Sequence, residues 1–411
     1  MKINRQNNNP LIEAYQNADI KKFRELISNG ENVNCLDEFK RSLISIVVTN
    51  CEKLKNNKDF FHALLDADVM LERIGVEKGL LTICIEEHSN TYYAKELLKN
   101  NINVNSMGKI PYIGMIENTM DYTEIEQQEN EYTNYESYGP PVFDALLQNK
   151  MKFFDLMLEY NADVNVCDTH GLNILDLLLN VCDLKRKEMI EAFERLLDYG
   201  VDIDVRNIDG SQIIHHIINN EKYYLLDVLF EKSKDIDINS RDNKGITALM
   251  YATANSNLKS MEFLIEKGAN MDIYALDGEN ALSISINYLN DVRNFELLVK
   301  KGANLVLRDE KFLGHSILHK IAAIDCQFPQ NPTDEYRKKI RKTINTYYKL
   351  VLEKHPELLD QKNNLGKTPV DILKRKKSYT HKKKKFLDGF QIKNKSKSKN
   401  INQTDKTIDR F

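Results

Sequence analysis

The sequence has little glycine and proline, with 16 and 8 residues among 411. This scarcity excludes collagen-like, linker-rich and turn-dense all-β architectures. No apolar run approaches the roughly 18 residues that a membrane-spanning helix needs. Residues 1–9 form a polar N-terminal end without the apolar stretch of a secretory signal. Hydrophobic residues nevertheless make up 42% of the chain, so it can bury a core.

Cysteine is also sparse, and no Cys-x-x-Cys pair occurs among the six cysteines. Scattered single cysteines favour buried thiols in a reducing compartment over a disulfide framework. We therefore expect an intracellular, cytoplasmic protein. A nuclear location stays open because of the charge at the C-terminal end.

The formal net charge is −3, but the charged residues are distributed unevenly along the chain. Residues 374–411 contain 14 Lys and Arg residues against three acids, so the preceding 373 residues carry a net charge of −14. An acidic body joined to a basic tail presents surfaces of opposite sign to charged partners.

A repeat of about 34 residues runs through the chain. Its clearest copy opens with DNKGITALMYA at 242–252 and closes with KGAN at 267–270, and a second KGAN stands at 301–304. The opening glycines Gly210, Gly245, Gly278 and Gly314 are 35, 33 and 36 residues apart. Regular spacing of this kind indicates a stack of similar units.

The residues of the clear copy predict a turn followed by two short helices. Asp-Asn-Lys-Gly is a turn sequence, since an Asx side chain bonds nearby backbone and glycine accepts positive φ. Thr247 stands where an N-cap hydroxyl would begin the first helix, and Gly268 where a left-handed residue would end the second. Helices this short must stack on their neighbours to be stable.

These motifs resemble the ankyrin repeat family, whose period is about 33 residues and whose signature contains T-P-L-H-x-A. The resemblance implies an all-α fold, an ankyrin-repeat α-solenoid of helix-turn-helix repeats with short β-turn connections. Degenerate copies extend it to about nine or ten units over 10–373. Two insertions interrupt the array: an acidic, Tyr-rich one near 111–141 and a second near 325–336. Residues 374–411 are expected to form a basic, disordered tail.

Two short motifs could suggest chemistry but fit the repeat better. Gly366-Lys367-Thr368 resembles the end of a phosphate-binding loop, yet position 361, where its first glycine is needed, is Gln361. His315 and His319 have the i, i+4 spacing of metal ligands, but the repeat register places His315 in a turn and His319 inside the fold. We therefore expect no catalytic residue, no cofactor and no metal, and a protein that is not an enzyme.

The resemblance implies a protein–protein interaction scaffold that binds its partner through turn tips and first-helix faces on a concave surface. A few central anchors would then dominate the affinity. The tip positions that flank the turn glycines have mixed charge, which favours an unknown protein partner over a uniform polyanion. They are His170, Leu172, Asp209, Ser211, Lys244, Ile246, Asp277, Glu279 and His315.

The basic tail supports alternative functions. Its two clusters are typical of nuclear-import signals or of patches that bind nucleic acid or an anionic surface, although a tail that merely aids solubility fits as well. The clusters comprise Lys374, Arg375, Lys376, Lys377, Lys382, Lys383, Lys384 and Lys385. In this interpretation nucleic acid would bind through the tail only.

A third alternative is an adaptor or effector that recruits a host protein to another machine. The abundance of Asn, Lys and Ile indicates an AT-rich genome, such as that of a large DNA virus or an intracellular parasite. We expect a monomer.

Overall fold

The computed structural model describes residues 9–50, 53–71, 79–110, 137–168, 172–180, 182, 185–207, 209–287, 291–309, 313–327, 335–375 and 380–390. It divides into two compact units: unit 1, Met1–Ile208 with Tyr224–Lys234, and unit 2, Asp209–Tyr223 with Asp235–Phe411. Both units are built from short α-helices, as the repeat predicts. No helix in these ranges is long and apolar enough to cross a bilayer.

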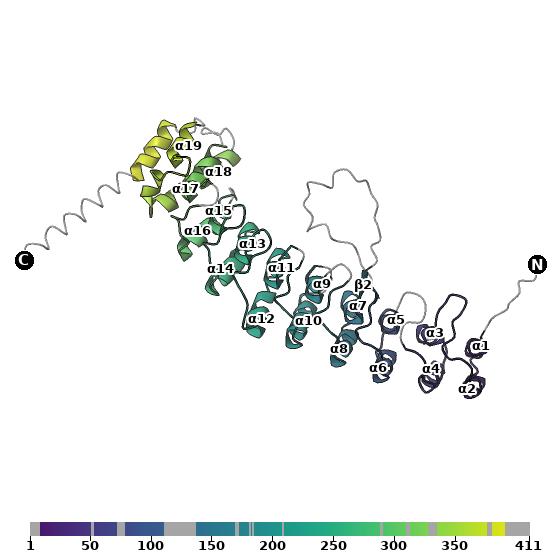
Figure 1. Ribbon diagram of the computed structural model, residues 1–411. Helices are drawn as coiled ribbons and strands as arrows, with labels where there is room; N and C mark the ends of the chain where they lie inside the picture. The colour runs from purple at the N-terminus through teal and green to yellow at the C-terminus, as the bar shows by residue number, and fades with distance from the viewer. Residues whose placement is uncertain are drawn as a thin grey trace, which may run out of the picture. The chain divides into compact units, whose positions relative to one another are not determined.

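Unit 1 is a two-row stack of helices with one two-stranded ribbon. Figure 1 shows α1, α3, α5, α7 and α9 in one row and their partners α2, α4, α6, α8 and α10 in the other. The elements are α1 (Pro10–Gln16), α2 (Ile20–Ser28), α3 (Leu43–Thr49), α4 (Asn57–Leu65), α5 (Leu80–Glu87), α6 (Tyr92–Lys99), β1 (Gly108–Ile110), β2 (Ser137–Gly139), α7 (Pro141–Leu147), α8 (Met151–Glu159), α9 (Ile174–Asn180), α10 (Arg186–Asp198) and α12 (Leu225–Lys232).

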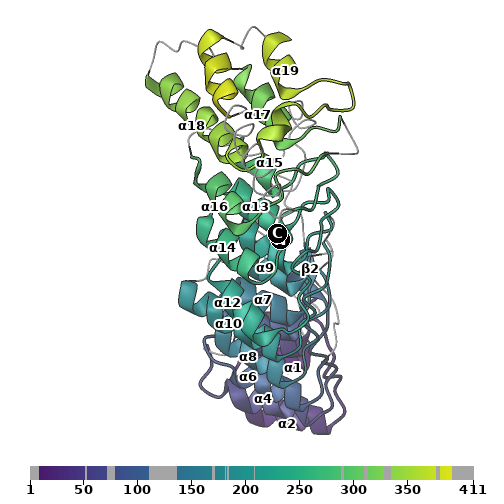
Figure 2. The same ribbon diagram turned by 90° about the vertical axis from the view of Figure 1, so that its left-hand side faces the viewer.

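Unit 2 repeats the same arrangement. First helices pack in the order α11, α13, α15, α17, α19, and second helices in the order α14, α16, α18. Figure 2 shows its connecting turns projecting to one side of these helices. The elements are α11 (Ile213–Asn219), α13 (Ala248–Ala254), α14 (Leu258–Glu266), α15 (Ala281–Ser285), α16 (Arg293–Lys301), α17 (Ile317–Asp325), α18 (Glu335–Leu352), η1 (Pro356–Leu359) and α19 (Pro369–Arg375).

An asparagine ladder joins successive repeats beyond the second helices. In unit 2, Asn239 Oδ1 accepts the backbone N–H of Asn270 at 2.7 Å, and Asp272 Oδ1 accepts that of Asn304 at 3.1 Å. In unit 1, Asn165 Oδ1 accepts the N–H of Asp202 at 2.8 Å. In these repeats the Asn or Asp that follows the second helix satisfies a backbone donor of the next repeat.

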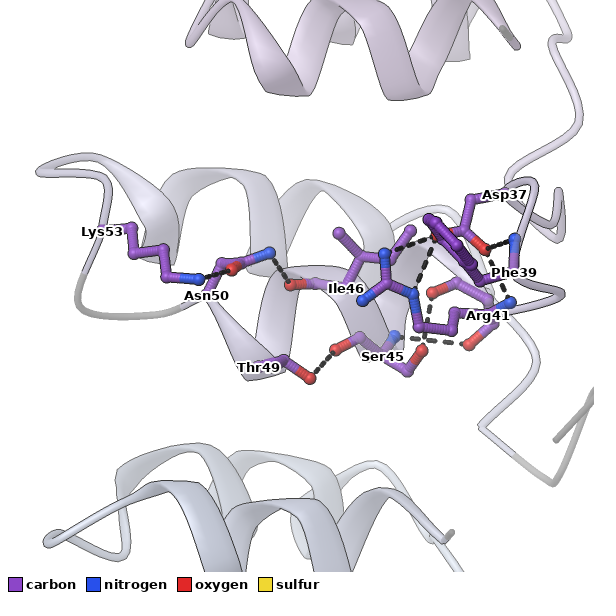
Figure 3. A network of polar contacts seen from close by, with 9 residues as sticks. Asp37, Phe39, Arg41, Ser45, Ile46, Thr49, Asn50 and Lys53 are labelled. Carbon is purple, nitrogen blue, oxygen red and sulfur yellow. Dashed lines mark hydrogen bonds and ion pairs between the residues drawn. The ribbon is translucent and has the colours of Figure 1, made fainter. Parts of the chain in front are cut away.

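The turn before α3 lacks the glycine that marks the clear repeats. This turn is held by Asp37, whose Oδ1 accepts the N–H groups of Phe39 and Arg41 at 2.9 and 2.8 Å and whose Oδ2 pairs with the Arg41 guanidinium at 2.7 Å (Figure 3). Lys40 has a φ of 60°, the left-handed position that Gly245 takes in the clear repeat. The turn is therefore the same, but a lysine replaces the glycine that marks it in the sequence.

The two expected insertions differ in what the structure describes. Residues 111–136 of the first lie outside the described ranges, but both of its ends are antiparallel strands, with Gly108 opposite Gly139. At the second, Asp325 ends α17 and Tyr336 already belongs to α18. Much of the added length is therefore helix, since α18 has 18 residues where α16 has nine.

The expected disordered tail differs from the structure in residues 380–390. A helix covers 381–390 and follows α19 in the chain as a second helix follows a first. Leu387 is 1% exposed and Lys383 5% exposed, so one side of this helix is packed. The first part of the basic segment is thus a folded element of unit 2.

Candidate functional site

The turns of unit 2 are shaped by an acid or amide at their first position. Asp242 Oδ1 accepts the N–H groups of Lys244 and Ile246 at 2.9 and 2.7 Å, and Gly245 has a φ of 76°. The hydroxyl of Tyr251, on the first helix, donates to Asp242 Oδ2 at 2.9 Å. Burial, together with this bond, raises the pKa of Tyr251 well above its usual value. The turn at Asp242 is therefore tied to its own first helix.

Neighbouring turn tips are also joined by backbone hydrogen bonds. Asn243 N–H donates to the Asp209 carbonyl, Leu276 N–H to that of Lys244, and Asn364 N–H to that of Leu313, each at 2.8 Å. An arginine side chain adds a further hydrogen bond between turns: Arg241 donates to the Tyr274 carbonyl at 2.7 Å. Backbone hydrogen bonds thus join the three successive tips at 209, 243–244 and 276, and separately the tips at 313 and 364.

The tip residues predicted from the sequence are unequally accessible. Lys244 and Asp277 are exposed, whereas Ser211 is buried and so cannot contact a partner without a rearrangement. His170 lies outside the described residues. The others are half-buried: Leu172, Asp209, Ile246, Glu279 and His315. Glu279 is also paired with Lys320 at 2.9 Å, so its charge is partly neutralised.

Sequence reasoning missed three leucines on these tips. Leu276, Leu313 and Leu365 are 55, 42 and 64% exposed. Each stands one or two residues before a turn glycine, a position that the repeat register could have identified. These three leucines give the tips an exposed apolar component.

The two histidines at the signature position are structural. In His319, Nδ1 accepts the N–H of Ser316 at 3.2 Å and Nε2 donates to the Lys367 carbonyl of the next repeat at 2.9 Å. His215 makes the same pair of bonds, with Gln212 at 3.1 Å and the Ser240 carbonyl at 3.1 Å. Burial lowers the pKa of both, that of His319 to about 4. Both rings are thus neutral and use both nitrogens within the fold.

The remaining candidate motifs from the sequence also have structural roles. The described ranges contain no cluster of His, Cys, Asp and Glu side chains able to hold a metal ion. His315 stacks on His319 with ring centroids 5.4 Å apart and planes 4° apart. Gly366 has a φ of 69°, and the hydroxyl of Thr368 accepts the N–H of Asp371 at 3.2 Å, as expected for a repeat opening and the start of α19.

The predicted basic residues fall into two groups with different environments. Lys376 and Lys377 lie outside the described residues. The exposed members are Lys374, Arg375, Lys382, Lys384 and Lys385. Lys383 is instead buried, with its ammonium 2.8 Å from Asp325 Oδ2 and 3.0 Å from Asn345 Oδ1.

Comparisons with known proteins agree with the repeat assignment. The ankyrin repeat family model, which describes three copies, matches residues 178–275 and 236–309. No curated protein matches the sequence.

One solved structure that resembles the chain is the ankyrin repeat domain of Bcl-3, a member of the IkappaB protein family. The two are 18% identical with a TM-score of 0.46, and the match covers 56% of this chain and 92% of that one. An ankyrin repeat domain from Acinetobacter baumannii has 20% identity, a TM-score of 0.40 and coverage of 50 and 96%. The chain thus has an all-α, ankyrin-type solenoid fold with stacked helix pairs and Asx-anchored turns, and its residues 178–309 match the ankyrin repeat family.

Proposed function

We propose that the protein is a non-enzymatic scaffold that binds a partner protein through the turn tips and adjoining first-helix faces of its repeats. Ankyrin repeats generally mediate protein–protein interaction, and here one observation supports the proposal most strongly. Neighbouring tips of unit 2 are joined by backbone hydrogen bonds in two groups, 209–276 and 313–364, and both groups carry exposed leucines, the first beside exposed charges. Preorganised tips of this kind lose little conformational entropy when they bind.

The chemistry of the tips indicates the kind of partner. Leu276 and Leu313 offer apolar anchors, and Lys244 and Asp277 offer charges of opposite sign between and beside them. Apolar centres surrounded by polar groups are typical of protein interfaces, where a few anchors supply most of the affinity. The partner would therefore present apolar side chains among charges of both signs.

The test is quantitative affinity capture with the full chain and two variants. Leu276→Asp with Leu313→Asp places charges on the tips. Val306→Asp is the matched control, because Val306 is 40% exposed but lies outside the tips. We expect a small set of proteins to be recovered by the parent chain and the control and lost, by at least about tenfold, from the tip variant.

Recovery of the same proteins at the same level by all three chains would contradict the proposal. Circular dichroism and urea unfolding of each variant establish that the tip substitutions leave the fold intact. Because the substituted side chains are exposed, we expect both variants to unfold within about 0.5 kcal/mol of the parent.

A further inference from the structure

The buried lysine of the basic run is an anchor between three helices. Lys383 pairs with Asp325, the last residue of α17, and its ammonium lies 3.8 Å from the centroid of the Tyr348 ring on α18. Asp325 is itself fully buried and also pairs with Arg341 of α18. A carboxylate without these partners would be strongly unfavourable at this position. The helix 381–390 is therefore fixed against α17 and α18.

The side of α18 that receives this helix continues into exposed lysines. Arg341, Asn345 and Tyr348 are spaced by four and three residues, so they form one stripe along α18. Lys338 precedes Arg341 by three residues and extends the stripe. Lys342 follows Arg341 and borders it, and both lysines are exposed.

Charge of one sign dominates both helices. Helix α18 contains six Lys and Arg residues and a single acid, Glu335, while 381–390 contains four lysines and a single acid, Asp388. Lys382, Lys384 and Lys385 are exposed, and the structure gives them no ion pair with any described residue. Docking thus places the basic helix 381–390 against α18, which has a basic run of its own at 337–342.

We infer that α18 and the docked helix 381–390 form one folded cationic surface that binds the phosphate backbone of duplex nucleic acid. Fixed lysines lose less entropy on binding than those of a flexible tail, and each phosphate contact releases counterions. A membrane surface fits less well, since a helix that lies in lipid needs a free apolar face. Here Leu387 is packed inside the fold.

Fluorescence anisotropy with a labelled 20-base-pair DNA duplex tests this inference on the full chain. One triple variant, Lys338→Ala, Lys342→Ala and Lys349→Ala, removes exposed charges of α18. The second, Lys382→Ala, Lys384→Ala and Lys385→Ala, removes those of the docked helix. The control, Lys152→Ala, Lys259→Ala and Lys300→Ala, removes three exposed lysines elsewhere.

We expect each of the two test variants to bind about tenfold more weakly than the control at 100 mM salt. The slope of log affinity against log salt should decrease by about one for every lysine that contacts a phosphate. Thermal unfolding establishes that the variants are folded. If the α18 variant binds as the control does, the tail acts alone and the inference is wrong. It is equally wrong if the duplex does not bind at 50 mM salt, or if phosphatidylserine vesicles bind and the duplex does not.

Asp325→Asn provides a second, independent readout. The substitution removes one negative charge, so a flexible basic tail would bind the duplex equally well or more tightly. A surface that depends on docking would bind at least about threefold more weakly, because Lys383 loses its counter-charge and the helix is released. Equal or tighter binding would contradict the inference.

Discussion

His319, a residue type that often binds metals or transfers protons, has a structural role in this protein. Its side chain is fully buried, and its two ring nitrogens join the start of its own helix to the carbonyl of Lys367 in the next repeat. A neutral ring is needed for this, since Nδ1 must accept a hydrogen bond. The i, i+4 spacing with His315 therefore reflects the repeat and not a metal site.

The neutral state of His319 predicts a pH dependence of stability. Burial lowers its pKa from 6.5 to about 4, so between these values the unfolded chain binds a proton that the folded chain does not. The free energy of unfolding must then fall as the pH decreases from 6.5 to 4. Urea unfolding at pH 7 and pH 5 should show a smaller difference for His319→Gln than for the parent chain.

The matched control for this experiment is His381→Gln, because His381 is exposed. This variant should keep the pH dependence of the parent. If the free energy of unfolding of His319→Gln differs between pH 7 and pH 5 as much as that of the parent, His319 does not contribute to the pH dependence of stability.

Lys383 is expected from the sequence to be an exposed residue of the basic tail, but it is buried in an ion pair with Asp325. We predict that Asp325→Asn destabilises the C-terminal repeats by about 3–5 kcal/mol, because the buried Lys383 and the half-buried Arg341 lose their shared counter-charge. Replacing both partners, Asp325→Leu with Lys383→Met, should cost less than Asp325→Asn alone. Hydrogen exchange of α18 and of residues 381–390 measures both effects.

The exposed pair of Glu266 and Lys301, 2.8 Å apart, is the control for burial. Lys301→Met should change stability much less than Asp325→Asn, since water solvates the remaining carboxylate. If Lys301→Met and Asp325→Asn lower the free energy of unfolding equally, burial does not increase the cost of breaking the Asp325 pair.

At the level of elements, the helix 381–390 completes the C-terminal part of unit 2. It covers Asp325 and Tyr348, which would otherwise be left with fewer partners. A chain cut after residue 373 or 375 therefore loses part of its fold as well as its basic charge. Experiments that remove the tail at that point cannot separate the two effects.

Two truncations measure what residues 381–390 contribute to stability. A chain that ends at residue 390 should unfold at the same urea concentration as the full chain. A chain that ends at residue 375 should unfold earlier, with hydrogen exchange in α18 faster by at least about tenfold, because the docked helix is missing. Identical unfolding of both truncated chains would show that 381–390 contributes no stability.

On the scale of the whole molecule, the two proposed binding surfaces differ in the interaction that would hold their partners. The turn tips combine leucines with charges of both signs, whereas α18 and 381–390 carry mostly lysine. Apolar anchoring depends weakly on ionic strength, but phosphate binding depends on it steeply. The two activities should therefore respond differently to salt and to substitution.

We predict that Leu276→Asp with Leu313→Asp leaves the affinity for the DNA duplex within about twofold of the parent chain, because those tips lie outside the cationic surface. Raising the salt concentration from 50 to 200 mM should release the duplex while the captured protein set is largely retained. Anisotropy and quantitative capture, run on the same preparations, measure the two responses. Parallel loss of both activities would mean that one surface serves both.

The repeat, the turns and the helix starts could be predicted from the sequence because they depend on residues close together in the chain. An Asx side chain bonds the backbone two and four residues ahead, a hydroxyl begins a helix, and a glycine tolerates positive φ. Where a local substitute serves equally well, as Lys40 does in place of glycine, the pattern disappears from the sequence while the structure persists. The same locality made the position of the tip leucines predictable, although not their exposure.

Tertiary structure alone decided which groups are accessible and which are buried. Four consecutive lysines look alike in sequence, but the rotation of their helix relative to α18 turns Lys383 toward Asp325 and the others toward solvent. Ser211 became buried and the α18 lysines became neighbours of the tail for the same reason. Burial and pairing depend on contacts between segments distant in the chain, and these follow from how the repeats stack.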